Sequence, residues 1–157
     1  MGLFLLWFLF GIGILVQAAY LLLIFGRTAW SKPPSSSSPA SESAEGVTVL
    51  ISAHNEYHNL KKLIPKLFEQ EYPKYDVMIV NDRSTDRTKR FLEEMMAEYP
   101  RLRSVTVKYT PRHVTSKKYA LTLGIKVAKY DVILLTDADC MPSSPQWIEK
   151  MTAPVRQ

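Results

Sequence analysis

The sequence predicts an α/β protein with a Rossmann-like, mostly parallel sheet, preceded by one transmembrane helix. Three observations carry this prediction. Residues 1–26 contain no charged side chain, four short apolar runs alternate with helical patterns after residue 46, and polar clusters close three of those four runs. Because an alternation of strands and helices implies parallel pairing with right-handed crossovers, one open sheet is expected. A chain of 157 residues is long enough for one ordinary domain.

Residues 3–26 are predicted to form the transmembrane helix. The apolar run exceeds the roughly 20 residues that a helix needs to cross the hydrocarbon core of a bilayer. A cleaved secretory signal is the alternative, since residues 16–18 offer small side chains at plausible cleavage positions. The run nevertheless continues through residues 21–24, and no basic residue precedes it as in signal peptides. We therefore expect a membrane anchor in contact with the lipid bilayer.

The first charges after this run set the expected orientation. Arg27 and Lys32 follow the span, with Trp30 between them as an interfacial aromatic residue. The positive-inside rule then places the rest of the chain in the cytoplasm, as a single-pass membrane protein. Cys140 is the only cysteine, which excludes an internal disulfide and suits a reducing compartment.

Residues 27–46 are predicted to be a linker. They are rich in serine and proline and lack the apolar bulk that a core requires. The folded domain is expected to cover residues 47–157. Its net charge of +5 comes from basic residues interleaved with acids. Without a basic stripe carrying aromatic residues, a nucleic-acid partner is not expected.

Four strands and three helices are predicted within this domain. The strands are 47–51, 77–80, about 104–109 and 132–135. The first helix carries Leu60, Leu63, Ile64, Leu67 and Phe68 on one face, with Pro65 expected to kink or interrupt it. The second carries Phe91, Leu92, Met95 and Met96, and the third Ala120, Leu121, Gly124, Ile125 and Ala128. The fourth strand is a continuous apolar run, which predicts burial on both faces.

Acidic side chains follow three of these strands. Glu56 closes the first, Asp82 the second, and the segment 137–139 the fourth. In open parallel sheets, ligands bind beyond the carboxyl ends of the strands. These acids are therefore expected at one rim of the sheet.

Asp137 and Asp139 are the candidate metal site. Two residues apart in extended chain, their carboxylates share a face and can approach one divalent ion. Mg²⁺ or Mn²⁺ prefers carboxylate oxygens together with waters and substrate phosphates, so two carboxylates leave room for a diphosphate. The alternative is an acidic turn that caps a helix starting near Pro142.

The other candidates also have plain structural alternatives. Asp82 accepts a hydrogen bond from a base or ribose, or else forms an Asx turn, whereas Asp86 is interpreted as a helix cap. Glu56 can be a first-turn acid favoured by the helix dipole. Lys117 either reaches a diphosphate oxygen or is solvated. Cys140 is expected to be a small buried thiol, and no histidine is assigned a ligand role.

Four segments in this order resemble family 2 glycosyltransferases of GT-A fold: residues 47–56, 80–86, 117–121 and 135–139. The resemblance covers residues 47–150. It implies that the sheet is the nucleotide-binding half of a GT-A fold. It also implies transfer of a sugar, with inversion, from a nucleotide sugar such as a UDP-sugar to a hydroxyl of an acceptor lipid or glycan.

The resemblance also implies roles for single residues. Ser52 and Glu56 would line the uridine pocket, and Asp82 would hydrogen-bond the uracil ring. Lys117 would lie near the nucleotide, Asp137 would contact the ribose side, and Asp139 would ligate the Mg²⁺ or Mn²⁺ ion that bridges the diphosphate.

Two departures limit what the resemblance implies. Asn81 stands where the family more often has a second acid. The family's general base would lie beyond Gln157, and residues 140–157 supply none in a suitable motif, so no catalytic residue is assigned. The chain is therefore predicted to be the donor-binding half of a membrane glycosyltransferase. The alternative is a non-catalytic, membrane-tethered nucleotide-binding or scaffold protein.

Overall fold

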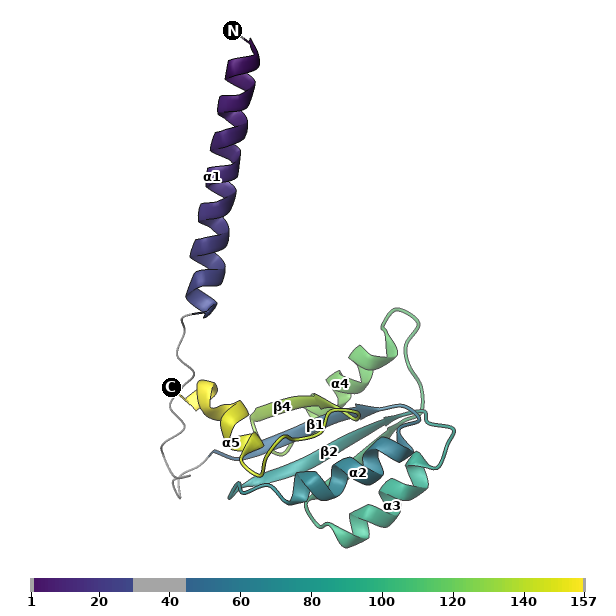
Figure 1. The fold of residues 1–157 in the computed structure, drawn as a ribbon. Coiled ribbons are helices and arrows are strands. Elements are labelled where there is room, and N and C mark those ends of the chain that lie inside the picture. The colour runs from purple at the N-terminus through teal and green to yellow at the C-terminus, as the bar shows by residue number, and fades with distance from the viewer. Residues whose placement is uncertain (1, 30–44, 157) are drawn as a thin grey trace. The chain divides into compact units, whose positions relative to one another are not determined.

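The computed structural model describes residues 2–29 and 45–156, which belong to two separate units (Figure 1). Most of the predicted linker, including Trp30 and Lys32, lies outside the described residues. The first unit contains helix α1 (Gly2–Ala29), which extends beyond the predicted span at both ends. Its length and apolar composition allow it to cross a bilayer, and a signal sequence meets the same criteria.

The second unit is built on a four-stranded parallel sheet, which confirms the predicted fold class. Its strands are β1 (Val47–Ala53), β2 (Tyr75–Asp82), β3 (Leu102–Val107) and β4 (Val132–Asp137). Their order is β3-β2-β1-β4. The chain thus moves outward from β1 to β3 and then returns to the other side of β1. This reversal is the topological switch point at which open α/β sheets bind ligands.

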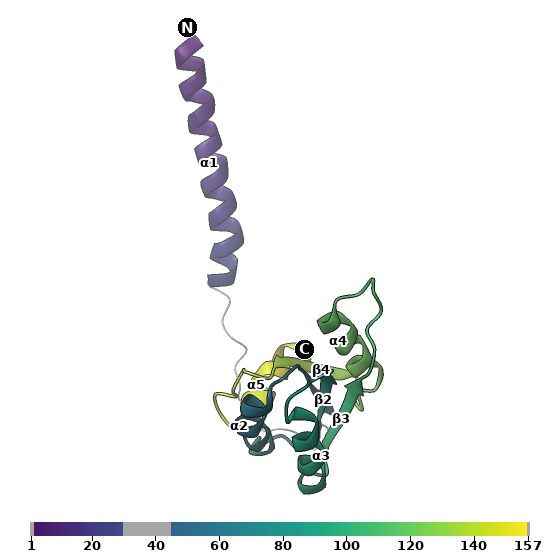
Figure 2. The same cartoon turned by 90° about the vertical axis from the view of Figure 1, so that its right-hand side faces the viewer.

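Helices cover the two faces of the sheet unequally (Figures 1 and 2). Helices α2 (Tyr57–Phe68) and α3 (Thr88–Glu98) lie on one face, and α4 (Ser116–Lys126) lies on the other. The short helix α5 (Trp147–Thr152) and the 3₁₀ turn η1 (Ala153–Arg156) end the described chain. Ile148 of α5 joins the core on the α2 side.

Strand alternation divides the core into two clusters. Val49, Ile51 and Ile79 face α2 and α3, whereas Leu50 and Val80 face α4. A Cβ at Gly124 would collide with the Leu50 side chain, so glycine permits α4 to approach β1 this closely. The α4 side therefore holds a smaller core that depends on close backbone contact.

Two sequence-based expectations are wrong. Leu135 on β4 is 51% exposed, because β4 is an edge strand and α4 packs over β1 and β2 instead. Ile125 on α4 is also exposed, although its spacing predicted a buried position. Of the two effects expected of Pro65, a kink or an interruption, the interruption does not occur, because α2 continues to Phe68.

A buried polar network joins the amino-terminal ends of the strands. Asp76 on β2 accepts hydrogen bonds from the Thr48 hydroxyl at 2.7 Å and from Arg103 Nε and Nη2 at 2.8 and 2.6 Å. Arg103 also donates to the Val127 carbonyl at 3.0 Å. The Thr48 hydroxyl accepts from the amides of Lys129 and Tyr130. This network ties β1, β2 and β3 to the start of β4, at the end of the sheet opposite the acidic rim.

Candidate functional site

A hollow of about 390 Å³ lies at the carboxyl ends of the strands, at the switch point of the sheet. All six residues predicted for donor and metal binding line it, together with three others. The lining residues are Ser52, His54, Glu56, Asp82, Ser116, Lys117, Asp137, Ala138 and Asp139. The predicted meeting of three acidic segments at one rim is therefore observed, while the roles of the individual residues remain predictions.

Strand register explains why these side chains meet. Ser52 on β1 pairs with Asp137 on β4 and with Val80 on β2. Because successive side chains alternate between faces, Ser52 and Asp137 share the α4 face with Leu50 and Val80. Asp82 lies two residues beyond Val80 and so has the same orientation. The amino-terminal end of α4 then closes the hollow with Ser116 and Lys117.

Asp137 is the last residue of β4, and Asp139 lies in the turn that follows. The Cys140 amide donates to the Asp137 carbonyl at 3.2 Å, and Ala138 between the two acids is buried in the core on the α2 side. Asp137 and Asp139 flank this anchor and both line the hollow. The next helix begins only at Trp147. The alternative of a capping turn near Pro142 is therefore wrong.

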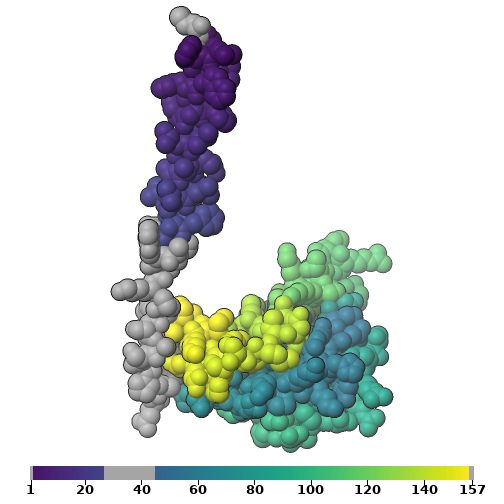
Figure 3. All heavy atoms as spheres, viewed as in Figure 1, coloured from purple at the N-terminus to yellow at the C-terminus, as the bar shows by residue number. Residues whose placement is uncertain are grey.

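Cys140 is exposed, not buried as predicted. The tight turn after β4 places it on the surface beside Asp139, with 3.6 Å between its Sγ and the Asp139 Oδ1 atom. The segment after β4, yellow-green in Figure 3, lies beside the blue surface of the segment around α2. The Glu71 amide donates to the Pro145 carbonyl there at 2.9 Å. This packing holds the end of the acidic turn in place.

Lys117 forms an ion pair with Asp137. Its Nζ atom donates to Asp137 Oδ1 at 2.9 Å across the hollow. The hydrogen bond and the negative charge of Asp137 raise the pKa of Lys117 above its ordinary value. The Lys117 side chain is 64% exposed, so it is solvated as well as paired with Asp137 at the hollow, and its contact with a diphosphate remains a prediction.

The two aspartates supply the hard oxygen ligands that suit Mg²⁺ or Mn²⁺. Across residues 2–29 and 45–156, no three His, Cys, Asp or Glu side chains gather into a metal-binding cluster. The donor set fits an ion that takes its remaining ligands from phosphate oxygens and water. It does not fit a closed structural metal site, which needs more protein ligands.

Asp82 is held at the end of β2 by its neighbours. His54 Nδ1 donates to the Asp82 carbonyl oxygen at 2.6 Å, and His54 Nε2 lies 3.4 Å from Asn55 Nδ2. The Asx-type contact belongs to Asn81, whose Oδ1 accepts from the Ser84 amide at 3.3 Å. The Asp82 carboxylate is thereby free of turn formation and lines the hollow.

Glu56 lies directly before α2 and also lines the hollow. It occupies the N-cap position without a side-chain capping hydrogen bond, and its Oε2 atom accepts from Asn59 Nδ2 at 2.6 Å. It is therefore not a first-turn residue of α2, and its donor-binding role remains a prediction.

The two loops around the site are clamped by Asn55. Its backbone has a φ of 58°, a left-handed conformation that asparagine tolerates better than most residues. Asn55 Oδ1 accepts from the amides of Thr85 and Asp86 at 2.8 and 3.3 Å, and its own amide donates to Ser84 Oγ at 2.9 Å. This clamp fixes the loop after β1 to the loop after β2.

Asp86 joins the starts of two helices. It accepts from the Thr88 amide at 3.0 Å and from the Tyr57 amide at 3.4 Å, which agrees with its interpretation as a cap. Partial burial raises the pKa of Asp86, but these hydrogen bonds outweigh burial, so its pKa lies below the ordinary value. The carboxylate therefore stays charged at neutral pH and acts structurally.

Sequence reasoning missed His54 and Ser116, which line the hollow, and Arg83 beside it, which donates to Asp82 Oδ1 and to Ser116 Oγ. His54 follows Ser52 by two residues, and this period-two spacing after a strand would have indicated it. Ser116 and Arg83 meet only through the crossover from β3 to β4, and no local pattern reveals that contact.

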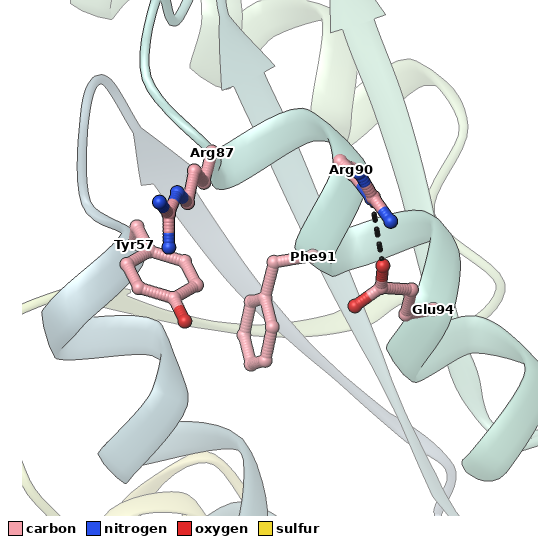
Figure 4. A pocket seen from close by; sticks show the side chains of 5 residues that line it. All are labelled: Tyr57, Arg87, Arg90, Phe91 and Glu94. Atoms are coloured by element: carbon pink, nitrogen blue, oxygen red, sulfur yellow. Dashed lines mark hydrogen bonds and ion pairs between the residues drawn. The ribbon is translucent and has the colours of Figure 1, made fainter.

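A second pocket, of about 350 Å³, lies between α2 and α3, on the other face of the sheet (Figure 4). Arg87 lies beside the Tyr57 ring, and Arg90 is paired with Glu94 at 3.0 Å. None of the predicted site residues lines it. The residues predicted for donor and metal binding thus line the hollow beside α4 and not this second pocket.

The sheet order and the switch point define an α/β domain of the GT-A type. The chain belongs to glycosyl transferase family 2, whose family model matches residues 48–157. This confirms the family resemblance drawn from the four sequence segments.

Curated relatives share about a third of the aligned residues. A beta-monoglucosyldiacylglycerol synthase of Nostoc sp. is 32% identical over 100 residues, which is 62% of this chain and 21% of that protein. The probable glycosyltransferase YdaM of Bacillus subtilis is 35% identical over 98 residues, 61% of this chain and 23% of that protein. The chain thus spans less than a quarter of the length of these relatives.

Solved structures agree with the fold. A mannosyltransferase from Pyrobaculum calidifontis, in complex with GDP-Man and Mn²⁺, is 26% identical with a TM-score of 0.64 over 91% of this chain and 44% of that chain. TarS 1–349 of S. aureus, in complex with UDP-GlcNAc, has a TM-score of 0.55 at 20% identity and covers 71% of this chain and 31% of that chain. The second likeness concerns the fold alone.

Proposed function

We propose that this chain is the donor-binding part of a membrane-anchored, inverting glycosyltransferase that transfers a sugar from a nucleotide sugar to an acceptor hydroxyl on a lipid or glycan. One observation carries the proposal. Ser52, Glu56, Asp82, Lys117, Asp137 and Asp139 line a single hollow at the switch point of a parallel sheet. The complex of the Pyrobaculum relative with GDP-Man supports a nucleotide-sugar donor.

Each residue has a proposed part in holding the donor. The Asp82 carboxylate accepts a hydrogen bond from the base, while Ser52 and Glu56 line the nucleoside side of the hollow. Lys117 places its positive charge beside the diphosphate, and Asp137 faces the ribose. We assign none of these residues the part of general base.

Asp139, with Asp137 beside it, is proposed to hold Mg²⁺ or Mn²⁺. When bound, the ion supplies Lewis-acid stabilisation of the departing nucleoside diphosphate. The Mn²⁺ in the complex of the Pyrobaculum relative supports this assignment.

Calorimetry on the full chain in lipid nanodiscs tests the proposal. We expect UDP or GDP to bind when Mn²⁺ or Mg²⁺ is present, and the affinity to fall when EDTA removes the metal. The reason is that an ion held at Asp139 would offset the negative charge of the diphosphate, so that metal and nucleotide would each strengthen the binding of the other. Folded protein that binds neither nucleotide with either metal would refute the proposal. Binding to the complete protein without any transfer to acceptor lipid or glycan would favour the non-catalytic alternative.

We further propose that α1 is the membrane anchor and that the sheet domain is cytoplasmic. Cys140 makes this testable, because it is the only cysteine and it is exposed. Inside-out and right-side-out membrane vesicles are prepared from cells that express the chain. A membrane-impermeant maleimide is expected to label Cys140 in the inside-out vesicles and to leave it unlabelled in the right-side-out vesicles. The measurement is the mass shift of the purified chain.

The control for this labelling is Cys140→Ala, which should remain unlabelled in both preparations. Labelling of right-side-out vesicles alone would reverse the proposed orientation. A chain recovered without residues 1–26 would instead identify the apolar run as a cleaved signal.

A further inference from the structure

The positive charge of the folded domain is concentrated in one segment. The 32 residues between Glu98 and Asp131 include eight lysines or arginines and no acidic residue. Residues 47–98 and 131–157 together carry ten basic and 13 acidic residues. The segment 99–130 is therefore strongly cationic, whereas the remainder of the domain is slightly acidic.

The most exposed part of this segment is the loop after β3 together with the first turn of α4. We call residues 108–118 the basic loop. Figures 1 and 2 show it, in green, extending away from the sheet. The Val114 amide donates to the Pro111 carbonyl at 3.2 Å, which closes a turn with Arg112 at its corner. The basic loop is thus a projecting surface feature.

Three cations of the basic loop are not neutralised by a neighbouring acid. Lys108, Arg112 and Lys118 are exposed, and none of the ion pairs formed within residues 2–29 and 45–156 includes them. Lys117 differs from them, because it pairs with Asp137 at the hollow. The three cations are therefore available to an anionic partner outside the domain.

Two large apolar side chains are exposed among these cations. The Tyr109 side chain is 68% exposed and that of Val114 is 41% exposed. Cations beside exposed apolar groups are typical of surfaces that bind the membrane interface. The cations attract anionic headgroups, and an aromatic ring lies at the level of the headgroups. The basic loop combines both kinds of side chain.

We infer that the basic loop docks on the anionic surface of a lipid bilayer, with its three unpaired cations against the headgroups and with Tyr109 and Val114 in the interface. The inference rests on the proposed anchoring of the chain by α1. A tether of this kind keeps lipid headgroups at a high effective concentration around the domain. An acidic protein or a free polyanion has no such advantage.

Docking of the basic loop has a consequence for the hollow. The loop contains Ser116 and Lys117, which line the hollow. A loop held on the bilayer therefore sets the donor site close to the membrane surface. This placement favours a membrane lipid over a soluble glycan as the acceptor.

Lipid quenching of a fluorescent dye on the loop tests the inference, with the full chain in nanodiscs. In a Cys140→Ala background, Val114→Cys carries an environment-sensitive NBD dye. The nanodiscs contain doxyl-labelled lipid, in a bilayer that is neutral or that includes phosphatidylglycerol. We expect a blue shift and quenching in the anionic nanodiscs only. Salt at about 1 M, which shortens the Debye length to about 3 Å, should reverse both changes. The same dye at Ala97→Cys, an exposed position of α3, should show neither change.

Two double variants with the same loss of charge separate local docking from net charge. Arg112→Gln with Lys118→Gln removes two cations from the basic loop. Each cation near an anionic surface typically strengthens binding about fivefold, so the docking equilibrium should fall about 25-fold and the quenching should drop to the level of neutral nanodiscs. Lys61→Gln with Lys62→Gln removes the same charge from exposed positions of α2, on the other face of the sheet, and should leave the quenching unchanged. Both double variants should bind UDP with Mn²⁺ in neutral nanodiscs as the wild type does, because none of the four residues lines the hollow.

The outcomes separate the inference from the proposed function. A chain that nanodiscs do not retain refutes the proposed anchor and the inference with it. A retained chain whose loop dye gives the same signal in neutral and anionic nanodiscs refutes the inference alone. Equal loss of quenching in the two double variants would assign the effect to net charge and would overturn the inference. A dye that responds only to UDP with Mn²⁺ would assign the basic loop to the donor and would overturn it as well.

Discussion

Asp139→Asn is expected to abolish most of the metal-dependent affinity for a nucleoside diphosphate. The substitution replaces the charged oxygen ligand proposed for the ion with a neutral amide of the same size. Loss of an outer-shell partner alone lowers metal affinity about 10- to 100-fold, so we expect a loss of about 100-fold or more for a direct ligand. Calorimetry with UDP at fixed Mn²⁺ measures this loss.

The matched control is Asp131→Asn, which makes the same change at an exposed residue directly before the first residue of β4, at the other end of that strand. It should bind as the wild type does. With EDTA present, Asp139→Asn and wild type are expected to be equally weak, because the carboxylate acts through the metal. If Asp139→Asn kept wild-type affinity in Mn²⁺, the proposed role of Asp139 would be wrong.

Arg103→Met is expected to cost about 3 kcal/mol of folding free energy, the largest stability effect that we predict. It removes the ionic partner of Asp76, whose side chain is 2% exposed, and leaves a buried carboxylate with the Thr48 hydroxyl. Breaking a buried ion pair from one side typically costs about 3–5 kcal/mol. The low end applies because the Arg103 side chain is 38% exposed, so water reaches the gap. Urea unfolding of the full chain, followed by pulse proteolysis, measures the change.

Arg90→Met provides the comparison, since it removes the same side chain from an exposed pair with Glu94 on α3. Surface pairs of this kind contribute about 0.3–0.5 kcal/mol. The double variant Arg103→Met with Asp76→Asn should recover part of the loss, because it removes the uncompensated charge. Equal effects of Arg103→Met and Arg90→Met would show that the buried network does not stabilise the sheet.

Local sequence patterns were sufficient for much of the fold. The first strand was predicted to begin at Val47 and does so. The third helix was predicted from Lys117 and begins at Ser116. The third strand lies two residues earlier than predicted, because its mixed polar sequence marks no clear boundary. These features succeed because apolar periodicity and turn residues act over a few neighbouring positions.

The positions of the acidic residues at the candidate site were also predictable from local sequence patterns. Glu56, Asp82 and the acidic pair each follow a strand, and parallel strands bring their carboxyl ends to one edge. Which residues contact one another there was not predictable. The Lys117–Asp137 ion pair and the Arg83–Ser116 contact each require the long crossover over the sheet to bring α4 back beside β1 and β2.

The sequence by itself determined the parallel α/β class, the positions of the acidic strand ends, and the membership in family 2. Only the tertiary structure decided that β4 is an edge strand with Leu135 exposed and that Cys140 lies on the surface. It also decided that Asp137 ends the strand, with Asp139 in the following turn, and that neither caps a helix near Pro142. The physical reason is the separation along the chain of the residues that interact. Strand and helix signals arise between neighbouring residues, whereas coverage of a strand face depends on where a distant helix packs. On β4 the covering helix lies over β1 and β2, so an apolar run that predicts burial is partly exposed.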